Sequence, residues 1–456
     1  MTTTHQSYQP GDTIAAIATP PGEGGVAIIR ISGPNALAIA NRLFSGPLFD
    51  YPSHTAHFGK ILDLQGQVID SGLALVLRTP RSYTGEETVE FHCHGGVLIS
   101  RKVLQATLAA GARAALPGEF TFQAFMNGKI DLTQAEAVQT LIAARSERAW
   151  QVAEAQLAGK LRDKVAQLQQ HLVDLTALFE AWVDFPEEGL EFQTEEEVND
   201  QLEMLIQEID ALSATFYEGK RLQTGFALCL LGPPNAGKSS LMNALLQTER
   251  AIVTEIAGTT RDLIEADLSL NGWPLHLIDT AGLRATEEVI EKEGIKRSHQ
   301  AAAEADLILA VIDVTRLKAG QELLATLPPE KTMIVWNKID LPHQDLPLCD
   351  FPYQAAISAK RQEGLTELKQ TIVRALGQGK GSSKEEVVLC SQRHFSALQE
   401  ALQCIKQAQA GLQAGRSPEF LAADSRLALR SLSAIIGMDI TEDVLSAIFS
   451  TFCVGK

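Results

Sequence analysis

The sequence predicts a multidomain α/β and α protein: an N-terminal α+β domain, an all-α domain, and a doubly wound α/β domain inserted in the all-α one. Three observations predict it. Short β-rich runs with turn signals extend to Lys129, a stretch almost free of Gly and Pro follows, and apolar strands alternate with helices from Gly225. At 456 residues the chain has room for about three domains. The expected boundaries are 1–130, 131–220, 221–380 and 381–456.

The first domain is expected to mix strands with helices. The runs 26–31 and 72–77 are apolar and β-branched, which is typical of strands. The segments 36–43 and 98–110 have helical spacing instead. This mixture, with no regular β-α alternation, predicts an α+β domain.

Long amphipathic helices are expected from residue 132 to about 220, interrupted at 184–189. Apolar residues recur there every three or four positions, as in Leu161, Val165, Leu168, Leu172, Leu175 and Leu178. The segments 387–411 and 420–437 repeat this pattern after a polar Gly/Ser linker at 377–383. We therefore expect the two helical stretches to form one domain that is interrupted by the α/β domain.

The net charge argues against a protein that binds nucleic acid through a broad basic surface. Lys+Arg 39 against Asp+Glu 56 gives −17. Residues 131–220 hold 6 basic and 19 acidic groups, so 6 − 19 = −13 of the charge lies there. We interpret this excess as a solvated helix surface. RNA contact elsewhere is then expected to be local or shared with a partner.

Targeting and cysteine patterns indicate a cytoplasmic protein with no membrane span. No run of about 18 uncharged apolar residues occurs, and the N-terminus lacks a basic region followed by an apolar one. The six cysteines form no CxxC pair, which disfavours a disulfide framework or a zinc site. They are Cys93, Cys229, Cys349, Cys390, Cys404 and Cys453.

The α/β domain carries a phosphate-binding loop. Apolar runs at 226–231, 275–278, 307–312 and 333–336 are expected to be buried parallel strands. Gly232-Pro-Pro-Asn-Ala-Gly-Lys238-Ser239 follows the first of them and precedes a helix expected to begin near Ser240. In such a loop backbone N–H groups surround the phosphates, Lys238 reaches the β- and γ-phosphates, and Ser239 binds Mg²⁺.

Later loops of the same domain predict a guanine nucleotide. Asn337-Lys-Ile-Asp340 follows a strand, and the carboxylate of Asp340 can accept both N–H groups of guanine, which adenine does not offer. Ser358-Ala-Lys360 is a weaker base-supporting loop. Asp279-Thr-Ala-Gly282 is expected near Mg²⁺ and the γ-phosphate, and Gly258-Thr-Thr-Arg-Asp262 supplies a hydroxyl to the metal, most simply from Thr260.

The water-positioning residue is not a glutamine. Leu283 follows Gly282, where Ras-like proteins place that glutamine. Hydrolysis therefore needs a different means of positioning the water. The candidates are an acidic side chain that orients the water and an extra cation that neutralises charge. The segment 287–294 offers several carboxylates, and chemistry alone does not choose among them.

Seven segments of the chain resemble the MnmE (TrmE) family of tRNA-modification GTPases, from Thr19 to the C-terminus. They are Thr19-Pro-Pro-Gly-Glu-Gly-Gly-Val-Ala-Ile-Ile-Arg30-Ile-Ser-Gly33, Tyr83-Thr-Gly-Glu86, His94-Gly-Gly96, Pro117-Gly-Glu-Phe120, Asn127-Gly-Lys129, Asp184-Phe-Pro-Glu-Glu188 and Phe452-Cys-Val-Gly-Lys456. Generic GTPases share only the nucleotide motifs, so the N-terminal block and the tail are the more specific part. The tail has Val454 where the family commonly has Ile.

The resemblance implies fold, cofactors and partners. It implies a homodimer joined through a folate-binding N-terminal domain, and a Ras-like P-loop G domain inserted in the helical domain. It also implies GTP hydrolysis driven by K⁺, with Mg²⁺, and 5-formyltetrahydrofolate or a related one-carbon folate. An MnmG-type FAD protein would join in a heterotetramer to add a carboxymethylaminomethyl-type group to C5 of the wobble uridine, position 34, of certain tRNAs. The alternative is a GTP-controlled ribosome-assembly or RNA-binding switch, which usually carries an added RNA-reading domain such as KH.

Site residues follow from the resemblance. Folate contacts fall on Arg30, Glu90, Lys129 and Lys456. K⁺ would be held by Asn235, Thr254, Ile256 and Thr259, and Mg²⁺ by Ser239 and Thr260. The GTP site would comprise Asn235, Ala236, Gly237, Lys238, Ser239, Ser240, Thr254, Thr259, Thr260, Asp279, Thr280, Ala281, Gly282, Asn337, Lys338, Asp340, Ser358, Ala359 and Lys360. The catalytic residues would be Lys238 and Glu291, three residues before Gly294; because Ile290 is an extra residue here, Glu288 and Glu293 stay as alternatives.

Two further side chains are ambiguous in the sequence. Cys453 near the cationic Lys456 would have a lowered pKa and could act in the one-carbon chemistry, or it is a small buried residue at a helix end. His94 and Cys93 are adjacent residues of types that can bind a metal. A turn near the folate pocket is preferred because further ligands at metal spacing are absent from the sequence.

Overall fold

The computed structural model describes residues 8, 11–185, 193–248, 264–279, 302–342, 346–347, 349–376, 387–438 and 440–455. The chain divides into two compact units. Unit 1 comprises Met1–Gln139, Leu157–Ala177 and Ser425–Lys456, and unit 2 comprises Thr140–Gln156 and Leu178–Asp424. Each unit is described by itself.

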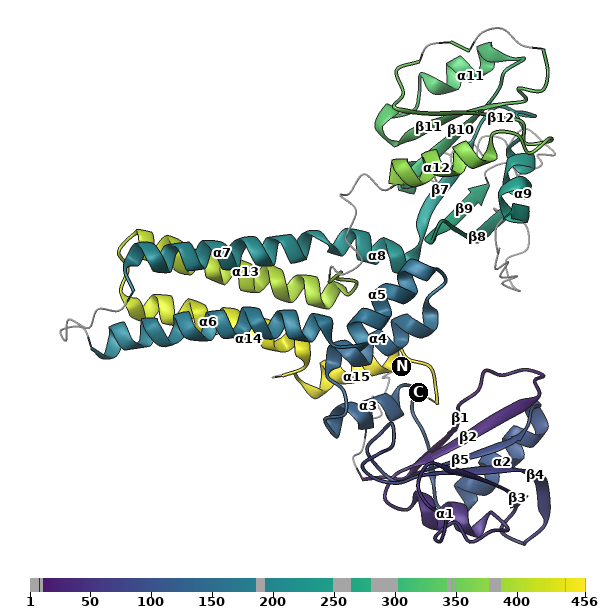
Figure 1. The fold of residues 1–456 in the computed structure, drawn as a ribbon, viewed down its shortest axis with the longest axis vertical. Helices are drawn as coiled ribbons and strands as arrows, with labels where there is room; N and C mark the ends of the chain where they lie inside the picture. Colours follow the sequence, from purple (N-terminus) through teal and green to yellow (C-terminus); the bar gives the residue numbers. More distant parts are fainter. Residues whose placement is uncertain are drawn as a thin grey trace, which may run out of the picture. The chain divides into compact units, whose positions relative to one another are not determined.

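Unit 1 contains a six-stranded sheet in the order β3-β4-β5-β2-β1-β6 (Figure 1). Its strands are β1 Ile14–Ile17, β2 Val26–Ser32, β3 Thr55–Leu62, β4 Val68–Leu77, β5 Thr88–His94 and β6 Arg113–Ala114. All neighbours are antiparallel except β1 and β6. The α+β expectation for the N-terminal part is confirmed.

Two helices cover one face of this sheet because alternate strand residues are apolar. Helix α1 spans Ala36–Arg42 and helix α2 spans Val97–Ala109. Their apolar sides join one core with Ile29 of β2, Val76 of β4 and Phe91 of β5. The opposite face therefore carries the side chains that alternate with these, including Arg30 and Glu90.

The remaining helices of unit 1 come from distant parts of the chain. They are α3 Glu119–Met126, the first part of α4 Leu132–Ala143, and parts of α6 Lys160–Asp184 and α14 Pro418–Ile436, with α15 Glu442–Ser450. Gln169 of α6 donates to Ser433 Oγ of α14 at 2.9 Å. The rings of Phe122 on α3 and Phe449 on α15 meet edge to face, with centroids 5.4 Å apart.

Unit 2 contains the second six-stranded sheet, in the order β12-β11-β10-β7-β9-β8. Its strands are β7 Phe226–Leu231, β8 Ile264–Leu270, β9 Trp273–Asp279, β10 Leu307–Asp313, β11 Thr332–Asn337 and β12 Tyr353–Ile357. Neighbours are parallel except β8, which runs antiparallel to β9. The predicted strands are confirmed, and β8 is an additional antiparallel edge strand that was not predicted.

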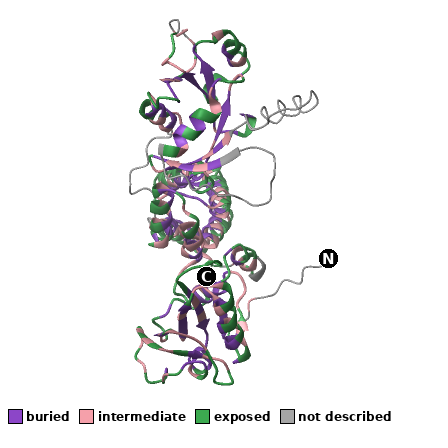
Figure 2. Cartoon of the chain, turned by 90° about the vertical axis from the view of Figure 1, so that its right-hand side faces the viewer, coloured by how far each residue is buried: buried purple, intermediate pink, exposed green. Residues whose placement is uncertain are grey.

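Helices lie on both faces of this sheet. Residues of α9 Lys238–Thr248 and α12 Leu365–Leu376 share one core with Leu228 and Leu230 of β7. Residues of α11 Leu317–Leu324 share the other core with Cys229 and Leu231. Strand β7 is therefore apolar at consecutive positions because both of its faces are buried, as the purple strands of Figure 2 show.

The inserted arrangement is confirmed within unit 2. Its helices α5 Glu147–Leu157, α7 Glu195–Ala214 and α8 Phe216–Thr224 precede the sheet, and α13 Gln392–Gln413 follows it. The ring of Phe216 on α8 stacks on Phe395 of α13, with centroids 4.6 Å apart. Leu389 N donates to Thr215 Oγ1 at 3.0 Å. The chain thus leaves the helices, forms the sheet and returns to the same helices.

The acidic surface expected in the helical stretch is present on α7. This helix begins with a capping box between Thr194 and Glu197, which suits an acidic first turn. Its exposed acidic residues are Glu195, Glu196, Glu197, Asp200, Glu203 and Asp210. Lys406 of α13 lies 3.4 Å from Asp210, and both side chains are half exposed. These exposed carboxylates fit the interpretation of the charge excess as a solvated helix surface.

Some predicted boundaries are wrong. The helix expected from Val387 begins at Gln392, because Val388, Leu389 and Cys390 are buried in a nonhelical segment that hydrogen-bonds to α5 and to Thr215. The helix expected near Ser240 is present and begins two residues earlier, at Lys238. The linker 377–383 and residues 186–189 of the interruption lie outside the described residues.

No helix among the described residues is long and apolar enough to cross a membrane. In the same part of the chain, no group of three or more His, Cys, Asp or Glu is placed to hold a metal. Cys93 is buried and His94 Nδ1 lies 2.9 Å from Asp70 Oδ1. His94, the last residue of β5, therefore has a carboxylate partner.

Candidate functional site

The parallel strands of unit 2 bring the predicted nucleotide loops to one edge of the sheet. Strands β7, β9, β10, β11 and β12 run in the same direction, so their carboxyl ends share that edge. In open α/β sheets this edge is where ligands bind. The phosphate loop follows β7, the Asp279 loop follows β9 and the base-reading loop follows β11.

The phosphate loop needs glycine at two positions. A Cβ on Gly232 would collide with the carbonyl oxygen of Val311, and one on Gly237 would collide with the amide of Asn337. Gly237 also has φ +101°, which L side chains rarely adopt. Lys238 Nζ donates to the carbonyl oxygens of Gly232 at 2.7 Å and Pro233 at 3.2 Å, so its ammonium lies over the loop.

Asn337 connects three loops through one buried amide. Its Nδ2 donates to Ala236 O at 2.8 Å, and its Oδ1 accepts from the backbone N–H of Lys338 at 2.8 Å and of Ala359 at 3.1 Å. The residue is 2% exposed. Asn337 therefore holds the phosphate loop, the base-reading loop and the Ser358 loop together.

The carboxylate of Asp340, which is predicted to read the base, is held ionised. Ser358 Oγ donates to Asp340 Oδ1 at 2.7 Å. This hydrogen bond lowers the pKa of Asp340 below its ordinary value, and the nearby Arg361 and Lys360 act in the same direction. Asp340 is consequently a carboxylate at neutral pH, the form that accepts two N–H groups from guanine.

Part of the predicted nucleotide site lies outside the described residues. Asn235, Ala236, Gly237, Lys238, Ser239, Ser240, Asn337, Lys338, Asp340, Ser358, Ala359 and Lys360 are described, together with the backbone of Asp279. Thr254, Ile256, Thr259, Thr260, Thr280, Ala281, Gly282 and Glu291, with Glu288 and Glu293, are not.

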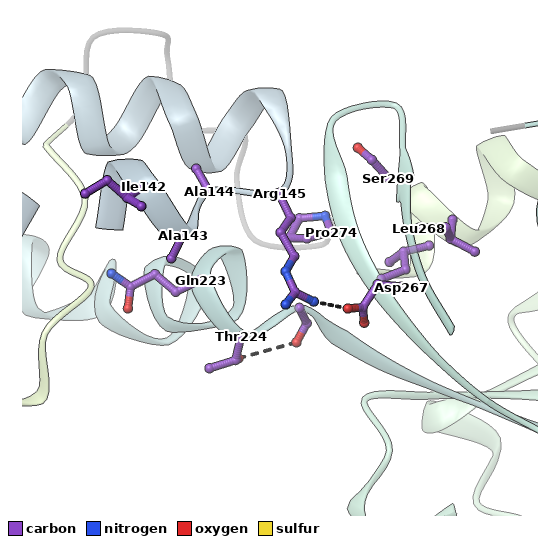
Figure 3. Close-up of a pocket in the computed structure, with 12 residues that line it drawn as sticks. Ile142, Ala143, Ala144, Arg145, Gln223, Thr224, Asp267, Leu268, Ser269 and Pro274 are labelled. Atoms are coloured by element: carbon purple, nitrogen blue, oxygen red, sulfur yellow. Dashed lines mark hydrogen bonds and ion pairs between the residues drawn. The ribbon is translucent and has the colours of Figure 1, made fainter. Parts of the chain in front are cut away.

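A cavity of about 600 Å³ lies at the other end of the same strands (Figure 3). It is lined by Gly225 just before β7, by residues 274–275 of β9 and 267–269 of β8, and by residues 142–145 where α4 ends and 223–224 of α8. Arg145 points to Asp267, and the two form an ion pair. The cavity lies where the antiparallel pair β8–β9 meets the helices, away from the nucleotide loops.

The second predicted site is on the face of the unit 1 sheet opposite α1 and α2. Arg30 of β2 lies directly opposite Glu90 of β5, and Arg30 Nε donates to Glu90 Oε1 at 2.7 Å. His92 Nε2 lies 3.2 Å from the other carboxylate oxygen. The Arg30 guanidinium also stands 5.6 Å from the ring centroid of Phe120. Cation, carboxylate and aromatic ring thus lie side by side.

The C-terminal tail reaches this cluster. Arg30 Nη1 donates to Gly455 O at 3.4 Å. Gly455 is buried with φ +95°, and a Cβ there would lie 2.6 Å from Ile17 O. The glycine of the tail is therefore required by its close approach to β1. Lys129 Nζ donates instead to Pro80 O at 2.9 Å, and Lys456 lies outside the described residues.

Sequence reasoning missed three residues at these sites. They are Phe120 and His92 beside Arg30, and Asp313 beside Lys338. A signal existed for Asp313, since a polar residue that directly ends a buried parallel strand faces the ligand edge. No local sequence pattern places Phe120 beside Arg30, because only tertiary packing brings the two side chains together.

Cys453 is exposed, so its interpretation as a buried residue is wrong. The other cysteines are buried or half-buried. Burial raises the pKa of Cys93 to about 11 and of Cys390 to about 12, and it also raises those of Cys349 and Cys404.

We expect brief iodoacetamide treatment of the folded protein at mildly alkaline pH to label Cys453 first, because alkylation needs an accessible thiolate. Peptide mass spectrometry measures the order of labelling. Cys453→Ser should remove the fast phase, and Cys404→Ser is the matched control that should keep it. Fast labelling at another cysteine would contradict the expectation.

The fold and the loops at the carboxyl edge define a P-loop GTPase. Residues 132–453 match the family model described as the MnmE helical domain, and residues 13–129 match the one described as the GTP-binding protein TrmE N-terminus. The chain belongs to the MnmE (TrmE) family of tRNA modification GTPases. It is an enzyme that binds and hydrolyses GTP and takes part in tRNA modification.

Similar proteins extend over the full chain. A tRNA modification GTPase MnmE of Protochlamydia amoebophila (strain UWE25) is 55% identical over 454 residues, with 99% of each chain covered. One of Chlamydia pneumoniae is 45% identical over 451 residues, with 98% of this chain and 99% of the relative covered. Among solved structures, the G domain of the T. maritima FeoB iron transporter is 28% identical, with a TM-score of 0.25, and covers 33% of this chain and 98% of that chain.

Proposed function

We propose that this GTPase works with an MnmG-type FAD protein to add a carboxymethylaminomethyl-type group to C5 of the wobble uridine, position 34, of certain tRNAs. The protein acts in the cytoplasm as a homodimer joined through its N-terminal domain, and it forms a heterotetramer with the partner. The observation that carries the proposal is the contact of Arg30 with Gly455. At the guanidinium of Arg30, the N-terminal segment 19–33 meets the C-terminal tail, and these are the two sequence segments most specific to the family.

The proposed division of labour follows four segments. Residues 1–130 bind folate and dimerise, 131–220 and 381–456 form the helical domain, and 221–380 hydrolyse GTP. The family resemblance supports this division. The helices α8 and α13 that flank the inserted sheet pack against each other, which agrees with it.

For GTP, the described loops supply fixed groups at each end of the nucleotide. Lys238 and the backbone N–H groups of 235–240 bind the phosphates, and Asp340 reads guanine with support from Ser358. Such fixed groups stabilise the charge that develops in phosphoryl transfer. Glu291 is proposed to orient the attacking water.

The donor atoms present fit the two cations. Ser239 lies in the first turn of α9, directly after the phosphate loop, and would hold Mg²⁺ with Thr260. The Asn235 side chain is exposed and makes no hydrogen bond to any residue that the structure describes, so its amide oxygen can serve K⁺. Thr254, Ile256 and Thr259 would complete that site. Bound cations would neutralise phosphate charge.

We expect GTP hydrolysis to be faster in KCl than in NaCl at equal concentration, by roughly tenfold or more, because one cation beside the phosphates stabilises the transition state. Phosphate release measures both rates. Asn235→Ala should lose the difference, whereas Asn243→Ala, an exposed asparagine on α9, should retain it. Equal rates in the two salts with the wild-type chain would refute the K⁺ site.

For the folate, a guanidinium beside a carboxylate matches the acceptors and donors of a pteridine ring. Arg30 and Glu90 are proposed to hold that ring, while Lys129 and Lys456 bind the anionic tail. The folate supplies a one-carbon unit to the modification. Cys453, which is exposed in the C-terminal tail of the chain, is proposed to take part as acid, base or nucleophile.

Nucleoside analysis of bulk tRNA by mass spectrometry tests the proposed function. Cells that lack this protein should lose the modified wobble uridine from the affected tRNAs, and the wild-type gene should restore it. Unchanged uridines together with a ribosome-assembly defect would instead favour the GTP-controlled switch.

A further inference from the structure

The phosphate loop and the base-reading loop of unit 2 each contain a non-glycine residue with left-handed backbone. Asn235 in the phosphate loop has φ +64°, and Lys338 in the base-reading loop has φ +72°. Asparagine adopts this conformation readily, but for lysine it is strained. Such a conformation persists only where surrounding contacts fix it.

The contacts that fix Lys338 are specific. Its backbone N–H donates to Asn337 Oδ1 at 2.8 Å, and its Nζ donates to Asn235 O at 2.8 Å. The same Nζ donates to Asp313 Oδ2 at 2.6 Å. The lysine side chain thus spans from the base-reading loop to the phosphate loop, with the Asp313 carboxylate as its counter-charge.

Asp313 is itself rigidly placed. It ends strand β10 directly opposite Asn337 of β11, and Val314 N donates to Asn337 O at 3.1 Å. Its other carboxylate oxygen accepts from Thr315 N at 2.9 Å and Thr315 Oγ1 at 2.7 Å. The side chain is 9% exposed. Both carboxylate oxygens are therefore fixed by donors.

The charge state of Asp313 suits this arrangement. Burial alone would raise the pKa of Asp313, but the hydrogen bonds from Lys338 and Thr315 outweigh it and hold the pKa below its ordinary value. A carboxylate paired with an ammonium at this distance makes a charge-assisted hydrogen bond, roughly twice as strong as a neutral one. The pair therefore stays intact at neutral pH.

We propose that Asp313 is a positioning residue for GTP: it holds the Lys338 ammonium on the Asn235 carbonyl and so fixes the base-reading loop relative to the phosphate loop. Asp313 touches neither nucleotide nor metal in this role. Its effect on GTP passes through Lys338. The inference rests on the proposed nucleotide site and adds a residue to it.

The direct test is the dissociation constant of GTP for the full-length Asp313→Asn variant, measured by fluorescence titration. Asparagine keeps the shape and can still accept from Thr315, but it removes the negative charge. Losing one hydrogen bond between charged groups costs about 1.5–3 kcal/mol, so affinity should fall roughly tenfold to a hundredfold. The kcat at saturating GTP should change little, because the lost interaction is equal in ground and transition states.

Asp306→Asn is the matched control. Asp306 lies at the amino end of the same strand and forms an ion pair of 2.7 Å with Arg221. It is expected to change GTP affinity by less than about twofold, since it is remote from the nucleotide loops. An equal loss in Asp306→Asn and Asp313→Asn would overturn the proposal in favour of a general stability effect.

A double-mutant cycle with Lys338→Gln separates positioning from a merely structural role. If Asp313 acts through Lys338, then Asp313→Asn should cause almost no further loss of GTP affinity in the Lys338→Gln chain. Additive losses would overturn the proposal. If Asp313→Asn does not fold, Thr315→Val weakens the hold on the same carboxylate, and an affinity loss of about twofold to tenfold is expected; unchanged affinity would count against the proposal.

Asp340→Asn in the same titration distinguishes a failure of the proposed nucleotide site from a failure of the role proposed for Asp313. Loss of GTP affinity in Asp340→Asn but not in Asp313→Asn would refute the role of Asp313 and leave the nucleotide site standing. Unchanged affinity in both would refute the site and the inference together.

Discussion

Replacement of Asp340 by asparagine is expected to lower GTP affinity roughly a hundredfold to ten-thousandfold and to create a preference for xanthosine triphosphate. Asp340 is ionised, and its carboxylate is proposed to accept two N–H groups of guanine. Two hydrogen bonds to a charged group contribute about 3–6 kcal/mol together. Asparagine presents an N–H where guanine also has a donor, whereas xanthine has a carbonyl oxygen there.

Competition titrations with GTP and xanthosine triphosphate measure this change. Ser358→Ala is the matched control, because it removes the hydrogen bond to Asp340 Oδ1 but leaves the carboxylate. It should weaken GTP by about tenfold or less and give no preference for xanthosine triphosphate. Retained GTP preference in Asp340→Asn would exclude Asp340 as the base-reading residue.

Glu291→Ala is expected to lower kcat for GTP hydrolysis by about 10²–10⁴, with little change in GTP affinity. Leu283 replaces the glutamine that orients water in Ras-like proteins, and we propose that a carboxylate takes that role instead. A water-orienting group acts in the transition state alone, and its loss therefore appears in kcat.

Single-turnover phosphate release and equilibrium nucleotide binding separate the two quantities. Glu288→Ala and Glu293→Ala serve as parallel variants of the same segment, and both should keep nearly full turnover. Full activity of Glu291→Ala with loss in one of the others would move the role to that residue. Loss of nucleotide binding in Glu291→Ala would mean that it holds the loop rather than the water.

Much of the fold could be predicted because burial on two faces leaves a clear pattern. Strand β7 is apolar at every position, and α6 places Leu161, Val165 and Leu168 on one buried side. Strand β8 was not predicted because it lies at the edge of the sheet, where polar residues, two of them acidic, alternate with its apolar ones. The Asn271-Gly272 pair that joins it to β9 has φ +50° and +84°, as in the tight turns of hairpins, and was the available signal.

The nucleotide loops were readable because each follows its strand locally. The Arg30 cluster was not, since it depends on the pairing of β2 with β5 and on a tail 425 residues away. The nonhelical segment at 388–390 shows the same limit, because its burial against α8 overrides a helical sequence pattern. Local periodicity cannot report contacts between such distant segments.

We propose that GTP hydrolysis in unit 2 and the Arg30 site in unit 1 serve one modification of tRNA. The most direct measurement is the wobble-uridine content of tRNA in cells that lack the natural gene and carry wild-type, Glu291→Ala or Arg30→Ala chains at equal abundance. We expect normal modification with the wild type and loss of modification with both variants. Normal modification with either variant would contradict the claim.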